Sequence, residues 1–480
     1  MTKKKKIFIF LLLLLTIYFF INYTIGNERF NLIKHKFPND FKIVVKKYLF
    51  PFKFIKEREK YILEQEQLFK NTIKKNKKEI NQLEFIKNKI NLLDFYQKNN
   101  LEDFVFKKTD NIDIKPINKI LKIYNPYKNI IYTGITHFFP GSAYLEFYEN
   151  KLFLLSSIGI IGYSEIDEEK FNFRQIKNNI DNFIDVKQFK KSHEIGSSTH
   201  FSTKDLKIYN NKVLVSYTNE LKENCWNTSI IVADLNLKEL KFKKLFQPNE
   251  CVHSLKNKDN EFTPFQSGGR IVKLDNDTIF LSVGDYRSRY LSQDTKSIFG
   301  KIIKININNG NYKIISSGHR NPQGLYYDIN NNFLLSTEHG PQGGDEVNLI
   351  KLNQNKIQNY GWPVASYGEH YGDKNKKENQ IKYKKYPLLK SHKDNGFIEP
   401  LKFFSKSIGV SEITSLGNLG YLFSSLKEES LYFFNLNKKK QIQEIKKFNI
   451  GERVRDLATG KNKIFLFLES TASIGVIDLK

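Results

Sequence analysis

A short phrase recurs six times along the C-terminal part of this 480-residue chain, and it constrains the fold more than any other feature. Each copy is a polar turn rich in Asn, Asp or Gly, followed by an apolar strand that ends in small or acidic residues. The six copies begin at Tyr148, Tyr209, Leu274, Asp328, Gly417 and Thr459. Their irregular spacing, from 42 to 89 residues, indicates six supersecondary units joined by loops of variable length. We therefore expect an all-β fold, a six-bladed β-propeller, because a β-sandwich of this length would be unusually large.

The repeats also predict where a functional site lies. In a hairpin, the start of the first strand and the end of the second strand lie at the same end, so the residues flanking each phrase share one rim. The unusual segments fall at these places: Phe265–Ile271, Gly318–Leu325 and Glu452–Asp456 before a phrase, and Glu338–Asn348 and Lys427 after one. Loops gathered around the axis of a propeller are a natural place for a ligand.

The basic residues on this rim differ from those in the rest of the chain. The net charge is +26, and the 77 basic residues are 68 Lys and only 9 Arg. Lys interleaved with Asn and Ile throughout is typical of compositional drift, so we expect no nucleic-acid partner. Three Arg and one Lys fall on the predicted rim: Arg320, Arg453, Arg455 and Lys427. Converging guanidinium groups suit a ligand with several carboxylates or phosphates, unless each pairs with a nearby acid such as Glu452 or Asp456.

The segment EHGPQGGDEVN, Glu338–Asn348, combines Gly and Pro with acidic residues. Such a backbone turns sharply and presents carbonyl oxygens beside the carboxylates of Glu338, Asp345 and Glu346. Calcium favours an oxygen-rich, flexible shell of this kind. The alternative is ordinary turn chemistry, since Gly/Asp loops are common.

Three ordered motifs resemble one known family. GHRNPQGL (Gly318–Leu325), EHGPQGGDEVNLI (Glu338–Ile350) and NYGWP (Asn359–Pro363) are similar to motifs of the soluble glucose/sorbosone dehydrogenases, the pyrroloquinoline-quinone (PQQ) dependent aldose sugar dehydrogenases. The resemblance extends more loosely from about Gly141 to the C-terminus. It implies a six-bladed propeller, PQQ over the central axis with Ca²⁺ on the quinone, and hydride transfer from the sugar C1 to PQQ.

The resemblance also assigns residues. It implies six contacts to the cofactor: Arg320, Asn321, His339, Lys427, Arg453 and Arg455. The carbonyls of Gly340 and Pro341 are implied ligands of the active Ca²⁺. Asp345 and Glu346 resemble part of a second, structural calcium region.

The chain departs from the family at the catalytic base. The family has a His just before Gln-Ser-Gly-Gly-Arg, but here Phe265 stands at that place, and Pro264 precedes it where an Asp is expected. Phenylalanine cannot accept a proton. His200 is a candidate base from another blade, although a lone His is more often structural. The catalytic residue therefore stays unassigned.

Residues 1–26 are predicted to be a signal anchor. Lys3–Lys6 precede an apolar run of 19 residues, 7–25, which as a helix would span roughly 28 Å, enough for a bilayer core. The basic cluster should stay cytoplasmic, which sends the C-terminal domain to the periplasmic or extracytoplasmic side. A cleaved signal peptide is the alternative, but Asn22–Gly26 contains no A-x-A-like cleavage site.

Two further regions follow the anchor. Residues 27–122 are predicted to be a charged helical spacer, because Lys56–Gln97 carries apolar residues at spacings of three, four and seven. Broken heptads make a coiled-coil stalk less favoured than a packed helix or a flexible spacer. Residues 123–480 are predicted to be the propeller domain. Its two cysteines, Cys225 and Cys251, exclude a disulfide-dense scaffold and a zinc site, and they could form one bridge in an oxidising compartment.

The sequence thus favours a membrane-anchored, PQQ- and Ca²⁺-dependent sugar or aldehyde dehydrogenase. Its expected partners are a small sugar substrate, an external electron acceptor and the membrane. The alternative, favoured by Phe265, is a catalytically silent propeller that binds a glycan or a protein partner. A third interpretation is an envelope structural protein in which the helical stalk matters most.

Overall fold

The computed structural model describes residues 12–17, 59–73, 76, 103–128, 142–157, 159–184 and 202–479. The chain divides into two compact units, residues 1–81 and 82–480. In the first unit, residues 59–73 form a helix whose surface includes a Lys60–Glu64 ion pair. This helix confirms a part of the helical prediction for Lys56–Gln97, and the rest of that segment lies outside the described residues.

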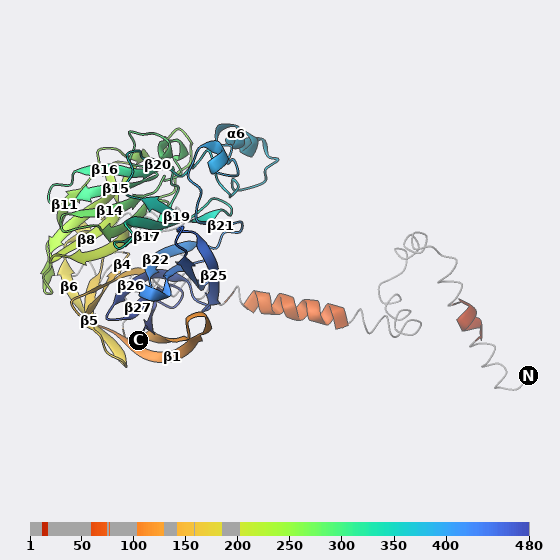
Figure 1. The fold of residues 1–480 in the computed structure, drawn as a ribbon. Helices are drawn as coiled ribbons and strands as arrows, with labels where there is room; N and C mark the ends of the chain where they lie inside the picture. Colours follow the sequence, from red (N-terminus) through yellow and green to blue (C-terminus); the bar gives the residue numbers. More distant parts are fainter. Residues whose placement is uncertain are drawn as a thin grey trace, which may run out of the picture. The chain divides into compact units, whose positions relative to one another are not determined.

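The described part of the second unit contains six four-stranded antiparallel blades (Figure 1). The strands are given from the innermost outward. Blade one consists of β3 (Ala143–Tyr148), β4 (Lys151–Ser156), β5 (Ile161–Glu165) and β6 (Lys170–Asn178), and blade two of β7 (Thr203–Tyr209), β8 (Lys212–Lys222), β9 (Cys225–Asp234) and β11 (Lys243–Phe246). Blade three consists of β13 (Gly268–Lys273), β14 (Thr278–Val283), β15 (Lys301–Asn306) and β16 (Tyr312–Ser317).

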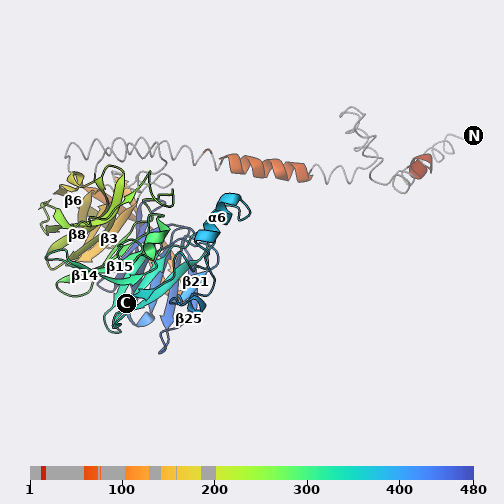
Figure 2. The same cartoon turned by 90° about the horizontal axis from the view of Figure 1, so that it is seen from above.

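Blades four to six follow the same order. Blade four consists of β17 (Pro322–Asp328), β18 (Phe333–Glu338), β19 (Asp345–Lys351) and β21 (Lys402–Phe404), and blade five of β22 (Val410–Ser415), β23 (Tyr421–Ser425), β24 (Ser430–Leu436) and β25 (Ile442–Asn449). Blade six consists of β26 (Val454–Gly460), β27 (Lys463–Leu468), β28 (Ser473–Asp478) and β2 (Lys119–Lys128). The innermost strands contact one another in the closed cycle β3–β7–β13–β17–β22–β26. The predicted six-bladed β-propeller is therefore present (Figures 1 and 2).

The six recurrent phrases lie at one position of the blade. Each contains the hairpin turn between the innermost strand and the next, as between β3 and β4 or between β26 and β27. Asn occupies left-handed backbone in several of these turns, including Asn150, Asn211, Asn332 and Asn462. Asn tolerates this conformation better than most residues, which explains the Asn-rich composition of the phrase.

The predicted boundary at residue 122 is wrong. Residues assigned to the helical spacer instead form β1 (Phe104–Ile114) and β2, and both belong to the propeller. β2 pairs with β28 and β1 pairs with β6, so an N-terminal strand supplies the outer edge of the last blade. Buried Leu121 and Ile123 flank the half-buried Lys122, and this short alternation is hidden in the sequence by the surrounding lysines.

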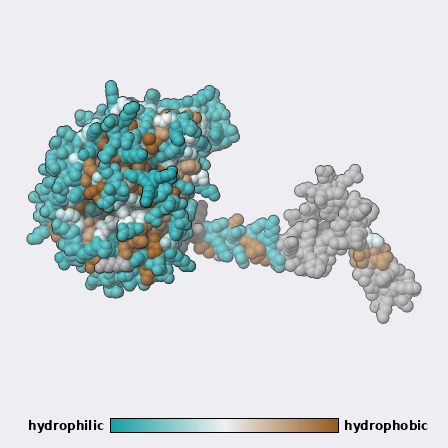
Figure 3. Space-filling view, in the orientation of Figure 1, coloured by the Kyte–Doolittle hydropathy of each residue, from teal (hydrophilic) through white to brown (hydrophobic). Residues whose placement is uncertain are grey.

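Shorter elements complete the fold. β10 (Glu239–Leu240) pairs with β6, β12 (Val252–His253) pairs with β9, and β20 (Gln358–Asn359) pairs with β16. Between β20 and β21 the chain leaves the blade in an excursion that carries α6 (Lys377–Lys385), at the periphery of the propeller in Figure 1. The Lys385–Asp259 ion pair ties α6 to the segment that leads into β13. The visible face of the propeller is largely hydrophilic (Figure 3).

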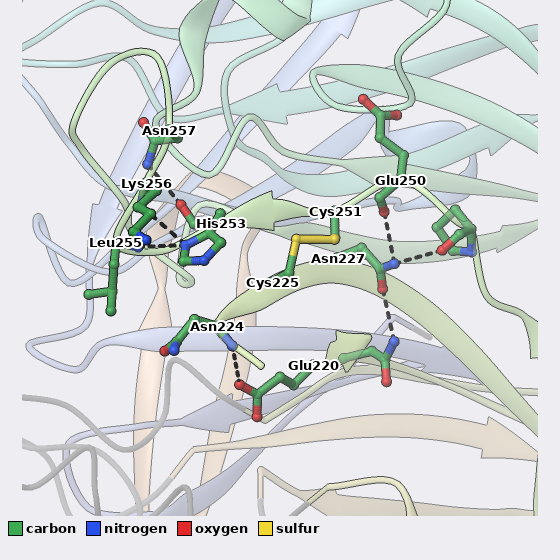
Figure 4. The surroundings of a disulfide bond; sticks show 12 residues. Glu220, Asn224, Cys225, Asn227, Glu250, Cys251, His253, Leu255, Lys256 and Asn257 are labelled. Atoms are coloured by element: carbon green, nitrogen blue, oxygen red, sulfur yellow. Dashed lines mark hydrogen bonds between the residues drawn. A yellow bond between two sulfur atoms is a disulfide. The ribbon is translucent and has the colours of Figure 1, made fainter. Parts of the chain in front are cut away.

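The predicted disulfide is present. Cys225, at the start of β9, is bonded to Cys251 just before β12, with the two Cα atoms 5.3 Å apart (Figure 4). Next to it, the Asn227 amide donates to the carbonyls of Pro248 and Glu250, both at 2.9 Å. The bridge and these hydrogen bonds hold the connection from β11 to β12 against β9.

The predicted membrane anchor falls mainly on residues outside the described part of the chain. Among the residues that the structure describes, no helix is both long and apolar enough to cross a membrane.

Candidate functional site

The structure brings the predicted site segments to one rim of the propeller. Segment 318–321 leads into β17, segment 339–344 joins β18 to β19, and Arg453 precedes β26. Lys427 follows the end of β23. These are starts of innermost strands and ends of second strands, so the hairpin argument is confirmed.

An ionic network closes the axis of the propeller just below this rim. Arg270 on β13 is buried and pairs with three carboxylates from other innermost strands: Asp205, Glu412 and Asp456. These carboxylates also accept backbone N–H groups of neighbouring innermost strands; Asp205 accepts from Ile271 at 2.7 Å, for example. Burial raises the pKa values of Glu412 and Asp456, while the charge of Arg270 opposes this rise. The network fixes the innermost strands relative to one another and provides a rigid floor for the site.

Two of the predicted cofactor residues are held by one carboxylate. Arg453 Nε donates to Glu469 Oε2 at 3.0 Å, and Arg455 donates to Glu469 Oε1 through Nε at 3.0 Å and Nη2 at 2.8 Å. Burial alone would raise the pKa of Glu469, but the charges of Arg455 and Arg453 hold it below its usual value. The acid that orients these arginines is therefore Glu469, and not Glu452 or Asp456.

A buried lysine faces this arginine pair. Lys204 on β7 is 8% exposed. It packs against Gly269 on β13, where an added Cβ would lie only 2.3 Å from the Lys204 Cβ. Burial, together with the positive charge of Arg455, lowers the pKa of Lys204 to about 7. No motif in the sequence indicated this residue, because only the closed ring brings β7 near β26.

Arg320 and His339 lie together at the mouth of the fourth blade. The Arg320 guanidinium donates through Nη1 to the carbonyls of His339 at 2.9 Å and Gly340 at 2.6 Å. Its carbon lies 5.4 Å from the centre of the Trp362 ring, a cation–π distance. Burial lowers the pKa of His339, so its imidazole is neutral near pH 7, and its buried Nε2 atom has no hydrogen-bond partner among the described residues. A buried ring nitrogen without a partner is suited to a ligand contact.

The other two predicted cofactor residues have different surroundings. Asn321 is buried, and its Oδ1 accepts from the Gly268 N–H at 3.2 Å and from Gln323 Nε2 at 2.9 Å. Asn321 therefore joins the starts of β17 and β13. Lys427 is exposed on the rim.

The two acids of the predicted calcium region have separate roles. The Asp345 carboxylate accepts three backbone N–H groups, from Gly340 at 3.0 Å, Ile408 at 2.8 Å and Gly409 at 2.7 Å. It fixes the 340–344 loop against the start of blade five. Glu346, by contrast, lines a small cavity, and burial together with the nearby charge of Glu338 raises its pKa well above the usual value.

This cavity lies between the fourth blade and the excursion that follows it. Its polar lining includes Glu338, Glu346, His392 and the backbone of Gly340. Glu338 accepts a hydrogen bond from the Arg320 N–H and contacts His319 Nδ1 at 2.9 Å, and His392 Nε2 lies 3.6 Å from Glu346. Two buried carboxylates beside backbone carbonyls fit a hard cation such as Ca²⁺. In the part of the chain that the structure describes, no group of three or more His, Cys, Asp or Glu side chains is arranged around a metal position.

No described residue of the site is an evident catalytic base. Phe265 lies in the segment before β13 and is 44% exposed. His200 lies outside the described residues, so its candidacy stays a prediction. His319 is fully buried between Ser316 and Glu338, which excludes it from direct contact with a sugar.

Sequence reasoning missed the residues that support the site. Glu469 and Asp285 were not singled out, and Gln266 and Arg270 were noted only as part of the Gln-Ser-Gly-Gly-Arg segment. Arg270, Asp285 and Gln266 act through contacts between blades, and Glu469 acts within blade six. The sequence SGGRI indicated the start of a blade, but nothing in it shows that Arg270 points into the axis.

The fold and the site together define a six-bladed propeller with three arginines, Arg320, Arg453 and Arg455, at one end of its axis. The sequence model of the glucose/sorbosone dehydrogenase family matches residues 207–477, more than half of the chain. The chain therefore belongs to the glucose/sorbosone dehydrogenase family.

Individual relatives agree with this assignment. An uncharacterized protein of Synechocystis is 30% identical over 224 residues, which cover 40% of this chain and 50% of that protein. The aldose sugar dehydrogenase of Escherichia coli is 26% identical over 227 residues, 43% of this chain and 57% of that protein. The chain thus spans about half the length of the curated relatives that it matches.

Solved structures support the fold. A glucose dehydrogenase superposes with a TM-score of 0.54 at 19% identity, over 70% of this chain and 95% of the other. The PQQ-bound aldose sugar dehydrogenase of Streptomyces coelicolor gives 0.52 at 18% identity, over 70% and 94%. At these identities the likeness is one of architecture, and it covers nearly the whole of each neighbour.

Proposed function

We propose that the protein is a PQQ- and Ca²⁺-dependent dehydrogenase of an aldose sugar or aldehyde. The observation that carries the proposal is the convergence of Arg320, Arg453 and Arg455 on a rim closed from below by the Arg270 network. PQQ is a planar tricarboxylate, and preoriented guanidinium groups bind carboxylates through paired, charge-assisted hydrogen bonds. Relatives described as aldose sugar dehydrogenase and quinoprotein glucose dehydrogenase give the same indication.

The residues of the chain would bind and orient the ligands. Glu469 holds the guanidinium groups of Arg453 and Arg455 in place, and these groups would pair with carboxylates of the cofactor. His339 is neutral near pH 7 and offers an unpartnered ring nitrogen. When bound, the quinone supplies the hydride acceptor and the metal polarises its carbonyl.

Calcium would be held by oxygen ligands near Gly340. The carbonyls of Gly340 and Pro341 are the ligands implied by the family motif. Gly340 lines the small cavity together with Glu338 and Glu346, which are cross-strand partners on β18 and β19. Asp345 would act through the backbone, because its oxygens accept the N–H groups of Gly340, Ile408 and Gly409. We therefore propose Glu346, and not Asp345, as the carboxylate ligand of the second calcium region.

A second candidate function is supported by one observation. Phe265 occupies the place of the family's base, and a propeller without that base could bind a glycan or a protein partner without turnover. The chain retains the family's residues that would bind the cofactor better than those that would abstract the proton. The first proposal therefore includes slow catalysis.

The location of the protein is also part of the proposal. A membrane anchor at the N-terminus and an extracytoplasmic propeller would let the site pass electrons to an external acceptor. The Cys225–Cys251 disulfide supports an oxidising compartment, because such bonds persist there and are rare in the cytosol.

Reconstitution tests the proposal. The purified protein is loaded with PQQ and Ca²⁺, and a panel of aldoses and aldehydes is assayed with a dye as electron acceptor. Substrate-dependent dye reduction that requires PQQ and is lost with EDTA supports the dehydrogenase. Tight PQQ binding without any turnover would favour the silent propeller, and no PQQ binding would reject both the cofactor and the activity.

A further inference from the structure

A fourth arginine, Arg287, which no motif indicated, lies beside Arg320. Arg287 lies in the loop after β14, where Tyr286 and Arg287 have positive φ values of 52° and 65°. This backbone is unfavourable for both residue types and persists only where the surroundings enforce it. Here Asp285 Oδ1 accepts the Arg287 N–H at 2.9 Å, and the buried Tyr286 hydroxyl lies 2.9 Å from Thr228 Oγ1. The loop therefore holds Arg287 in a fixed position.

Arg287 and Arg320 form a pair of like charges. With its amide oxygen facing the two guanidinium groups, Gln266 accepts from Arg287 Nε at 3.3 Å and from Arg320 Nη2 at 2.9 Å. Both guanidinium carbons lie over the half-exposed Tyr371 ring, at 5.4 and 6.0 Å from its centre. Burial and the charge of Arg320 lower the pKa of Arg287. Two cations thus share one neutral acceptor and one ring.

The nearby carboxylates are engaged elsewhere. Asp285 accepts from the Arg287 N–H and from the Trp362 indole at 2.8 Å, and Glu261 pairs with Arg289 at 2.7 Å. Among the described residues, neither the Arg287 nor the Arg320 guanidinium forms an ion pair with a carboxylate. Partly buried like charges without a counterion are costly, and a bound anion would offset that cost.

We propose that Arg287 and Arg320 together bind a carboxylate group of the ligand. The inference rests on the proposed function, because it concerns the same group of arginines at the rim. The carboxylate has two possible sources: PQQ, or a substrate that is an acidic aldose such as a uronic acid. In either case Arg287 is a further binding residue, and Gln266, held by Asp285, positions its guanidinium.

The variant Arg287→Gln tests this proposal by binding measurements. Calorimetry with Ca²⁺ present measures the affinity of the full-length protein for PQQ and, separately, for D-glucuronate and D-glucose. Loss of one charged partner should weaken the carboxylate ligand by about ten- to a hundredfold, and Arg287→Lys should recover a part of the loss. Arg174→Gln, on the exposed face of β6, is the matched control. Thermal unfolding followed by circular dichroism verifies that each variant folds.

The source of the carboxylate follows from which ligand responds. Weaker PQQ binding with unchanged glucuronate binding assigns the site to the cofactor, and the converse assigns it to an acidic substrate. Both results support the proposal. Unchanged affinity for both ligands, or a failure of the folded wild-type protein to bind either, would overturn it. Arg287-dependent glucuronate binding without any PQQ binding would reject the proposed cofactor and leave the carboxylate site in place.

Discussion

At the scale of single residues, several side chains of the site are oriented by partners that the sequence does not indicate. Arg453 and Arg455 are rim residues by position, but Glu469 sets where their guanidinium groups point. No periodicity or motif links Glu469 to them, since the contact arises from the pairing of β26 with β27 and the turn after it. Arg287 and Lys204 were also missed, because their contacts come from other blades.

Phe265 carries the first prediction. If it occupies the position of the base, the wild-type protein should bind PQQ and oxidise aldoses slowly, because general-base assistance contributes a factor of about 10² to 10⁴. Phe265→His combined with Pro264→Asp should raise kcat, since the carboxylate could orient the imidazole. Steady-state assays at saturating PQQ measure the effect. Rapid aldose oxidation by the wild type that survives His200→Ala would show that another residue is the base.

Lys204 predicts an unusual pH dependence of stability. Its pKa is about 7 in the fold and about 10.5 when unfolded, so the unfolded chain binds more protons between these values. The destabilisation by this buried charge is therefore full below pH 7 and fades toward pH 10. Lys204→Met should raise Tm at pH 6 and raise it less at pH 9. An equal change in Tm at both pH values, as expected of the exposed control Lys222→Met, would contradict the assignment.

At the scale of elements, the turn chemistry of the repeats was sufficient to predict the blades. The Asn and Gly residues at the hairpins set the local backbone whatever the rest of the chain does. β1 and β2 were missed because their strand pattern is short and rich in Lys. The blade that β2 completes also lies about 350 residues later in the chain, as in Leu121 opposite Ile477. The axial pairing of Arg270 with Asp456 likewise requires the ring to be closed.

The disulfide between β9 and the segment before β12 gives a prediction at this scale. It closes a segment with a sequence separation of 26, and the loss of that constraint on the unfolded chain should cost about 3 kcal/mol. The double variant Cys225→Ser/Cys251→Ser should show this decrease in the free energy of unfolding by urea under oxidising conditions. Adding a reductant should lower the wild type to the same value. A wild-type protein isolated with two free thiols would contradict the prediction.

At the scale of the whole molecule, closure of the ring depends on the N-terminal strand. β2 covers the edge of β28 and buries Leu121 and Tyr124 in the propeller. A chain that starts at residue 129 should lose cooperative unfolding, because the last blade keeps an open edge and an exposed apolar face. A chain of residues 82–480 should unfold cooperatively in a calorimeter. Indistinguishable unfolding of the two chains would mean that β2 is dispensable.

The site at the end of the axis depends on the residues, the strands and the closed ring together. Residues from at least three blades, among them Arg320, Glu469 and Arg270, converge there only because the ring is closed. The family motifs predicted the rim and its arginines, and the supporting contacts between blades emerged only with the fold. The central claim is that the arginines at this end of the propeller axis bind a planar polycarboxylate.

The most direct test is the affinity for PQQ of the wild-type protein and of Arg320→Ala, measured by calorimetry at saturating Ca²⁺. The wild type should bind PQQ. The variant should bind it about thirty- to a thousandfold more weakly, because a charged hydrogen-bond partner contributes roughly 2 to 4 kcal/mol. Arg174→Ala serves as the control and should match the wild type. The absence of wild-type binding, or equal affinity in a folded Arg320→Ala variant, would contradict the account.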